Sequence, residues 1–251
     1  DLYLVKGSPS RRRFFLDFFL KQASTEYGYQ LDNYVKILRK RNALLKNNQA
    51  ATKTFALTTE VFAEEAVKII LARINIVNLL DQLAGPIYEE MSEEQGGGLK
   101  IRYAISFPLD NGKINFDILR SAMLNQLKQI YEQECARKSS LIGPHRDDIN
   151  IYLNDRPARQ YASQGQQRSI AVSLKLAELA ALQKTKGEYP VFLLDEVLSE
   201  LDNERQKRLL RYLQGASFQS FLTTVHAESP YFKGNEAYVC HMANGQLFRK
   251  E

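Results

Sequence analysis

Residues 191–202 read Val-Phe-Leu-Leu-Asp-Glu-Val-Leu-Ser-Glu-Leu-Asp, and this stretch decides the fold. The run from Val191 to Leu194 has no polar position, which predicts a strand inside a parallel sheet that is covered on both faces. Asp195 and Glu196 follow at its carboxyl end, the edge where open α/β sheets bind ligands. Two acids there suit an Mg²⁺ ligand and a water-activating base. A buried strand ending in a solvated acidic turn would give the same pattern.

A second informative stretch lies upstream, where Ser163-Gln164-Gly165-Gln166-Gln167-Arg168 precedes a helical apolar pattern that runs from Ile170 to Ala181. Backbone N–H groups at a helix start favour an anion, and Gly165 would let a phosphate approach closely. The alternative interpretation is an ordinary N-cap before an amphipathic helix. The order of the parts favours the anion site. A Ser-x-Gly-Gln helix start, an apolar strand ending in Asp-Glu and then Leu201-Asp202 follow one another as in ABC-type ATPase heads.

Several motifs together resemble one family. The resemblance is to RecF, a family of bacterial recombination and replication-repair ATPases, and it runs from about Pro9 to about His226. It is carried by Arg12-Arg13-Phe14, by Tyr34 through Lys46, by Gly143-Pro144-His145-Arg146-Asp147-Asp148, by Ser163 to Arg168, and by Leu193 to Asp202. One departure is that RecF more often has Asp-Asp where Asp195-Glu196 stand here. Since Glu is the commoner base in the wider ABC group, the predicted role is kept.

The resemblance implies an α/β fold, an ABC-type ATPase head whose P-loop NTPase-like sheet is interrupted by a mainly helical arm. It also implies ATP and Mg²⁺ as cofactors, held between two subunits of a head-to-tail homodimer. The implied role of Asp195 is to bind the metal, and that of Glu196 is to activate water. The γ-phosphate held by the other subunit would be contacted by Ser163, Gln164, Gly165 and Gln166. Ser199 and Asp202 would lie at the dimer seam, and His226 would be a switch that senses the γ-phosphate.

The same resemblance implies partners and a cellular role. Family members bind DNA near junctions of single and double strands and work with RecR and RecO in loading the recombinase RecA, in the cytoplasm and in the SOS response. The residues themselves identify none of these partners. A non-enzymatic DNA-binding module is the alternative function.

No Walker A loop occurs in the sequence. The pattern Gly-x-x-x-x-Gly-Lys-Ser/Thr is absent, because Gly112-Lys113 is preceded by Phe107 at the first glycine position and followed by Ile114. In RecF this loop precedes the region matching Pro9, so the chain is interpreted as lacking an N-terminal P-loop segment. Without the loop's amides, Lys and Ser/Thr, we expect no ATP hydrolysis and no tight ATP binding by this chain alone.

Positive charge is concentrated near the N-terminus. Residues 1–53 hold eleven Lys and Arg against four Asp and Glu, and the remainder holds 23 against 25, which gives the net charge of +5. An apolar helical stripe from Leu31 to Leu45 leaves the basic residues on the outer surface. Such a surface is either a solvated face or a site for DNA phosphates. The predicted contacts are Lys36, Arg39, Lys40 and Arg41.

Other features limit the alternatives. Cys135 and Cys240 have no Cys-x-x-Cys partner, so neither a zinc site nor a disulfide framework is supported. The sequence has no run of eighteen apolar residues, and a membrane span is not expected.

Three parts are expected along the chain. Residues 1–8 are predicted to hold a strand of the head, residues 9–137 the mainly helical arm, and residues 138–251 the C-terminal part of the head. A strand at 149–153, a helix at 203–213, a strand at 218–225 and a hairpin around Asn244-Gly245 are expected in the last part.

Two other motifs suggest different functions. His145-Arg146-Asp147 resembles the kinase catalytic loop, but Tyr152 stands where that loop needs Asn. Asp147-Asp148 together with Asp195-Glu196 could form a two-metal nuclease site, which requires carboxylates that converge around the metals. We favour a buried turn with a local ion pair for residues 143–148, and the individual roles of His145, Arg146, Asp147 and Asp148 stay open.

Overall fold

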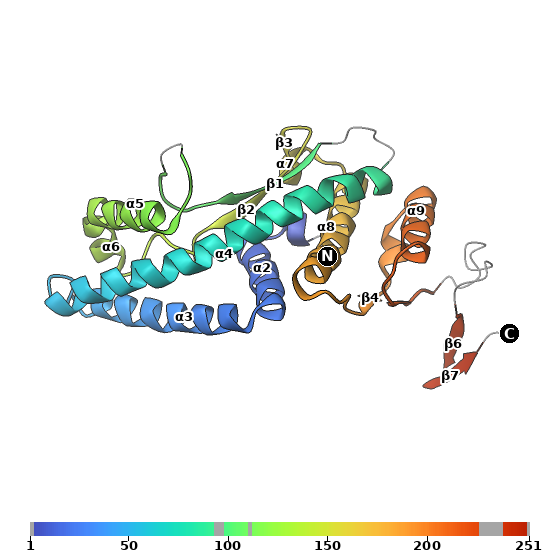
Figure 1. Ribbon diagram of the computed structural model, residues 1–251, viewed down its shortest axis with the longest axis horizontal. Coiled ribbons are helices and arrows are strands. Elements are labelled where there is room, and N and C mark those ends of the chain that lie inside the picture. The colour runs from blue at the N-terminus through green and yellow to red at the C-terminus, as the bar shows by residue number, and fades with distance from the viewer. Residues whose placement is uncertain (1–2, 93–97, 110–111, 226–237, 250–251) are drawn as a thin grey trace.

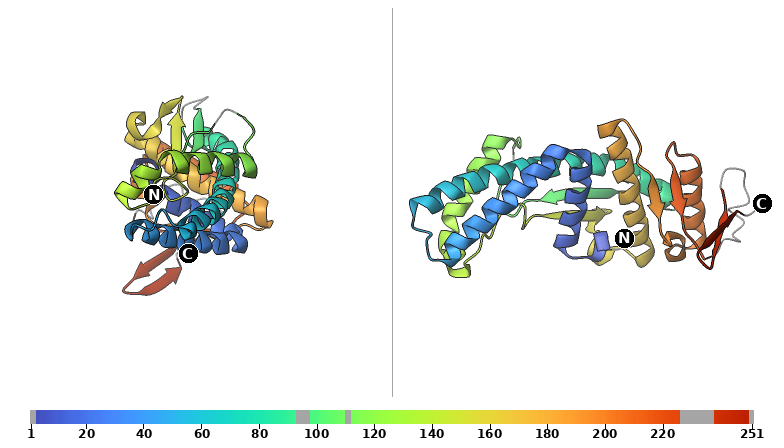
Figure 2. Two further views of the ribbon diagram at one scale, coloured as in Figure 1. Left: turned by 90° about the vertical axis from the view of Figure 1, so that its left-hand side faces the viewer. Right: turned by 90° about the horizontal axis from the view of Figure 1, so that it is seen from below.

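A computed structural model of the chain describes residues 3–92, 98–109, 112–225 and 238–249. The molecule is elongated, with a helical arm at one end and a smaller α/β part at the other (Figures 1 and 2). One hydrophobic core extends from Leu4 near the N-terminus to Leu209 in the α/β part. Among the described helices, none has the length and apolarity that a membrane crossing requires.

Three helices form the greater part of the arm. They are α2 (Pro9–Ala23), α3 (Thr25–Lys46) and α4 (Lys53–Met91), and α3 and α4 form an antiparallel hairpin (Figure 1). Side-chain caps define two of the helix starts, since Ser24 accepts the N–H of Tyr27 and Thr52 accepts the N–H of Phe55. All three helices lie in the segment that was expected to be mainly helical.

A small antiparallel sheet lies against α4. Strand β1 (Leu99–Ala104) pairs with β2 (Asp148–Leu153), and β2 pairs with the short β3 (Arg156–Pro157). Helices α5 (Phe116–Gln129) and α6 (Tyr131–Arg137) lie between the first two strands in sequence and pack at the arm end. The β1–β2 pairing joins residues on both sides of position 137, so the division into arm and head at that position stays a proposal.

The α/β part begins with α7 (Ala158–Tyr161) and the buried helix α8 (Gln164–Lys186), which packs against α4. Strand β4 (Phe192–Leu194) pairs in parallel with β5 (Ser220–Leu222). The turn η1 (Val197–Glu200) and helix α9 (Asn203–Gln214) connect them. Strands β6 (Cys240–Ala243) and β7 (Gln246–Arg249) form the predicted hairpin, and positive φ angles at Asn244 and Gly245 make its two-residue turn.

Two predictions about strands are wrong. The strand expected in residues 1–8 is instead the helical turn α1 (Tyr3–Lys6), closed by a hydrogen bond from the Gly7 N–H to the Tyr3 carbonyl. Leu4 and Val5 are buried, and α1 packs against α2, α7 and α8. The apolar run before Asp195 was expected to be covered on both faces, yet Leu193 is 71% exposed. Within the described residues β4 pairs only with β5, and the face of the sheet on which Leu193 lies is left open.

Candidate functional site

The start of α8 is a capping box. The Ser163 Oγ accepts the N–H of Gln166 at 3.2 Å, and the Gln166 Oε1 accepts the N–H of Ser163 at 2.8 Å. Ser163 and Gln164 are exposed, while Gly165 and Gln166 are half-buried. The predicted helix start is confirmed, and the amide groups of the first turn are close to the surface.

The acid pair lies at the carboxyl end of β4, where both side chains are exposed. Thr223, just beyond β5, holds this corner: its hydroxyl donates to the Asp195 carboxylate at 2.6 Å and accepts the Glu196 N–H at 3.0 Å. Glu196 has a φ angle of 51°, a left-handed conformation that costs energy for a residue with a side chain. The strained corner directs the two adjacent carboxylates out of the sheet edge.

The turn after the acid pair is tied to both neighbours. The Ser199 hydroxyl donates to the Glu196 carbonyl at 2.7 Å. The Gln206 side chain, from the first turn of α9, donates to the carbonyls of Leu198 at 2.7 Å and Leu201 at 3.0 Å. These bonds fix the turn relative to α9.

Asp202 begins α9, and its environment keeps it ionised. The Asp202 Oδ1 accepts the backbone N–H of Arg205 at 2.9 Å, and the Oδ2 forms an ion pair with the Arg205 guanidinium. The backbone hydrogen bond is the largest cause of the lowered pKa of Asp202. The Arg205 Nε also donates to the Ser169 Oγ in α8 at 3.0 Å. One arginine therefore connects the start of α9 to the start of α8.

The structure thus connects the predicted site residues into two linked groups. Arg205 bonds both Asp202 and Ser169 of α8, and its guanidinium lies against Gly165. Asp195 and Glu196 are linked to Ser199 and α9 through the turn at 197–201. His226 lies outside the described residues. Thr223, Arg205 and Gln206 were missed by the sequence analysis, because single Thr, Arg and Gln residues without a motif give no signal of their own.

The basic residues of α3 divide into two kinds. Lys36, Arg39 and Lys40 are exposed, as predicted for phosphate contacts. Arg41 is 1% exposed, so its predicted contact with DNA is wrong. Its guanidinium pairs with the buried Glu134 at 2.6 Å, donates to Ser140 and Thr59, and lies over the rings of Phe55 and Phe62. Helical periodicity turns this position inward, toward α4 and α6.

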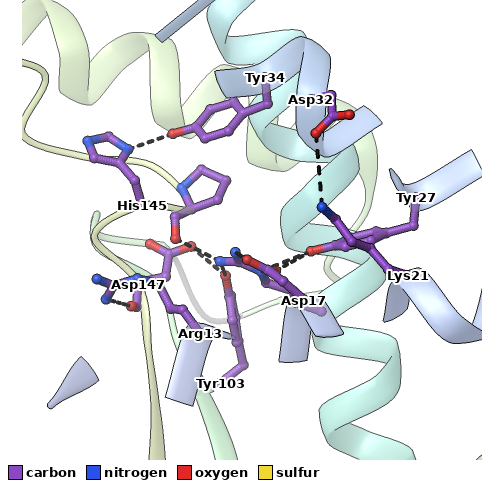
Figure 3. Close-up of polar contacts among 11 residues, drawn as sticks. Arg13, Asp17, Lys21, Tyr27, Asp32, Tyr34, Tyr103, His145 and Asp147 are labelled. Carbon is purple, nitrogen blue, oxygen red and sulfur yellow. Dashed lines mark hydrogen bonds and ion pairs between the residues drawn. The ribbon is translucent and has the colours of Figure 1, made fainter. Parts of the chain in front are cut away.

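The motif at residues 143–148 forms a turn that lies against the arm helices and is buried or half-buried except at Arg146 (Figure 3). The ring of His145 donates from Nε2 to the Ser140 carbonyl at 3.1 Å, which leaves Nδ1 to accept the Tyr34 hydroxyl at 2.5 Å. Burial lowers the pKa of His145 to about 4. The ring is therefore neutral, and both of its nitrogens are bonded within the protein.

The two aspartates of the same motif are held by protein groups. Asp147 accepts the Tyr103 hydroxyl at 2.7 Å and the Ser106 N–H at 2.8 Å, and burial raises its pKa. Asp148 receives two bonds from the Arg12 guanidinium, at 2.8 and 2.7 Å. Within the described residues no group of three or more His, Cys, Asp or Glu could hold a metal. The nuclease interpretation is therefore not supported.

Arg73, in α4, connects this turn to α2 and α3. It donates to the Pro144 carbonyl at 2.7 Å and to both oxygens of Asp17 at 2.8 and 3.0 Å, and Asp17 also accepts the Tyr27 hydroxyl. The residues that carried much of the family resemblance therefore form a buried polar cluster that holds the arm together.

The helical arm, the parallel strand pair that ends in two exposed acids and the capped start of α8 fit an ATPase head of ABC type. The chain belongs to the RecF family. It is 41% identical over 254 residues to the DNA replication and repair protein RecF of Heliobacterium modesticaldum, covering 99% of this chain and 67% of that protein. It is also 41% identical over 228 residues to the protein of the same name from Enterococcus faecalis, covering 89% of this chain and 60% of the relative. No family model matches the chain.

Solved structures of RecF proteins agree with this family assignment. The structure of the recombination mediator protein RecF with ATP in the RecFOR pathway superposes with a TM-score of 0.84 at 32% identity, covering 100% of this chain and 65% of that one. A second RecF structure, with an ATP analogue, gives 0.82 at 33% identity. The chain spans about two thirds of the length of the relatives it matches.

Proposed function

We propose that this chain supplies the arm and the C-terminal part of the head of a RecF-type protein that binds ATP and DNA in replication and repair. One observation carries the proposal: the capped start of α8 is connected through Arg205 to the start of α9, next to the sheet edge that presents Asp195 and Glu196. This arrangement suits a nucleotide shared between two subunits. The RecF relatives solved with ATP and with its analogue support the choice of ligand.

The site residues have distinct roles in this proposal. Mg²⁺ would neutralise charge on the nucleotide phosphates, and Asp195, exposed at the end of β4, is the residue that would hold it. Glu196 orients and deprotonates the attacking water, which its outward direction permits. Ser163, Gln164, Gly165 and Gln166 face the γ-phosphate held by the other subunit, while Ser199 and Asp202 lie at the seam. ATP binding would close a head-to-tail homodimer on DNA, and hydrolysis would open it.

The printed sequence has no Walker A loop, so hydrolysis requires a longer protein that contains this chain together with such a loop. We therefore expect the 251-residue chain to show neither ATP turnover nor tight ATP binding. A non-enzymatic DNA-binding module is the second candidate, favoured by this missing loop and by the exposed cations of α3. RecR and RecO are the partners expected for a member of the RecFOR pathway.

Two variants of the longer protein test the ATPase proposal. Glu196→Gln should slow hydrolysis by about 10²- to 10⁴-fold with ATP binding intact, so that an ATP-bound dimer accumulates. Ser163→Arg places a bulky side chain where the γ-phosphate of the other subunit must lie. It should abolish ATP-dependent dimerisation in sedimentation experiments while the affinity of the monomer for ATP persists. Loss of ATP binding in Glu196→Gln, or an undiminished dimer in Ser163→Arg, would contradict these roles.

A further inference from the structure

Arg205 lies between two motifs that are far apart in sequence. From the first turn of α9, its guanidinium pairs with Asp202 and donates from Nε to Ser169 in α8. The side chain is 28% exposed, so most of it is held between the two helices. Because a guanidinium is planar and has donors on several sides, it can hold two partners in a fixed geometry.

The guanidinium also lies directly against Gly165. A Cβ atom at Gly165 would come within 2.9 Å of the Arg205 Nη1, closer than real Cβ contacts, and 3.2 Å from its Cζ, so the guanidinium would have to move. Gly165 does not have a positive φ angle, so its conformation does not require glycine. The absence of a side chain instead leaves the space that the Arg205 guanidinium occupies.

Asp202 is fixed by the same arginine. One of its oxygens accepts the backbone N–H of Arg205 and the other meets the guanidinium. Both oxygens are thus engaged within the first turn of α9, which holds the carboxylate in one rotamer. A shift of Arg205 would release Asp202 and the Ser169 contact together.

We propose that Arg205 is a positioning residue of the nucleotide site. It sets the start of α8, with Ser163 and Gly165, at a fixed distance from the Asp202 carboxylate, so that both reach the other subunit as one rigid surface. Glycine at position 165 then leaves room both for the Arg205 guanidinium and for the phosphate. This inference rests on the proposed function, in which both motifs meet the nucleotide and the seam.

A double-mutant cycle tests the link between Gly165 and Arg205. In the longer protein, Arg205→Ala should weaken ATP-dependent dimerisation about ten- to a hundredfold, the size expected for lost charged hydrogen bonds. Gly165→Ala should weaken it similarly, since the added methyl group displaces the guanidinium. The double variant should be little weaker than either single variant. Arg205→Lys should recover only part of the loss, because an ammonium cannot reproduce the two-sided geometry. Additive effects of the two alanine variants would overturn the inference.

The control is Lys207→Ala. It also removes one positive charge from α9, two residues after Arg205, and the Lys207 side chain faces Glu204. It should dimerise like the unmodified protein. A second readout uses the 251-residue chain without nucleotide: Arg205→Ala should speed amide hydrogen exchange at residues 166–170 about tenfold, and Lys207→Ala should leave it unchanged. If the unmodified longer protein fails to dimerise with ATP, the proposed function is wrong, and exchange alone then decides the positioning role. Unchanged exchange in Arg205→Ala would overturn it.

Discussion

Two pairs of acids in the chain have opposite surroundings. Asp147 and Glu134, which lie among the arm helices and are called the arm acids, are buried, and each accepts two or more hydrogen bonds. Asp195 and Glu196 are exposed at a sheet edge, held mainly through Thr223 and the backbone. A buried carboxylate whose oxygens are already bonded stabilises a fold, whereas an exposed one on a strained corner can meet a ligand. In this chain, therefore, a motif that carries the family resemblance can hold the fold together.

The largest effect on stability should come from the buried ion pair. Arg41→Ala leaves Glu134 charged and unpaired in the core, and we expect it to lower the free energy of unfolding by about 3–5 kcal/mol. The matched control is Lys40→Ala, which removes the neighbouring exposed cation and should change stability by less than about 0.5 kcal/mol. Urea unfolding measures both. Equal effects would show that Arg41 is not held as described.

The next effect depends on pH and concerns His145. The ring stays neutral in the folded chain down to a pKa of about 4, whereas an unfolded histidine takes up a proton near pH 6.5. The unfolded state then binds more protons between these values, so stability is complete above pH 6.5 and falls as pH drops toward 4, by about 3 kcal/mol. Burial is the largest cause of the lowered pKa, and the cations Arg146, Arg13 and Arg41 lower it further.

Unfolding of the unmodified chain and of His145→Asn should be compared at pH 7, 6 and 5. Other acids titrate in both proteins, so the difference between the two curves isolates the histidine. That difference should change with pH in the direction given above. A difference that stays constant would exclude the buried neutral histidine.

A smaller effect is expected for the exposed cations of the arm. If Lys36, Arg39 and Lys40 contact phosphates, replacing all three by Ala should flatten the dependence of log K on log salt by up to about three units on duplex DNA. Folding stability should hardly change, because the side chains are exposed. The control variant replaces Lys128, Lys184 and Lys186, which removes the same charge from other exposed positions. Identical slopes for the two variants would leave the α3 surface as a solvated face.

Much of the secondary structure was predictable because it is set locally. The Ser163 cap, the Asn244-Gly245 turn and the apolar period of α8 each specify their conformation within a few residues. The exposure of Arg41 was mispredicted because a run of basic residues does not reveal which of them faces α6. Its partner there, Glu134, lies 93 positions later in the chain. The prediction of a strand at residues 1–8 was wrong for a similar reason. Leu4 and Val5 become buried against α8 within a helical turn, and the sequence does not show this partner.

The site was predictable in its acids and its helix start but not in the residues that connect them. Thr223 and Arg205 act through partners 28 and 36 positions away, and such pairs leave no periodic pattern in a single sequence. The roles of Asp147 and Asp148 stayed open for the same reason. Their partners Tyr103, Ser106 and Arg12 become visible only when the elements are assembled.

The most direct test compares two isosteric changes in the 251-residue chain, Asp147→Asn and Glu196→Gln, by urea unfolding at pH 7. Asp147→Asn places an amide among the Tyr103 and Ser106 donors and should lower the free energy of unfolding by about 2 kcal/mol. Glu196→Gln should leave it within about 0.5 kcal/mol, because the side chain is exposed. This result would establish that the arm acids hold the fold and that the head acids are available for chemistry. A Glu196→Gln variant as destabilised as Asp147→Asn, or an Asp147→Asn variant as stable as the unmodified chain, would contradict the account.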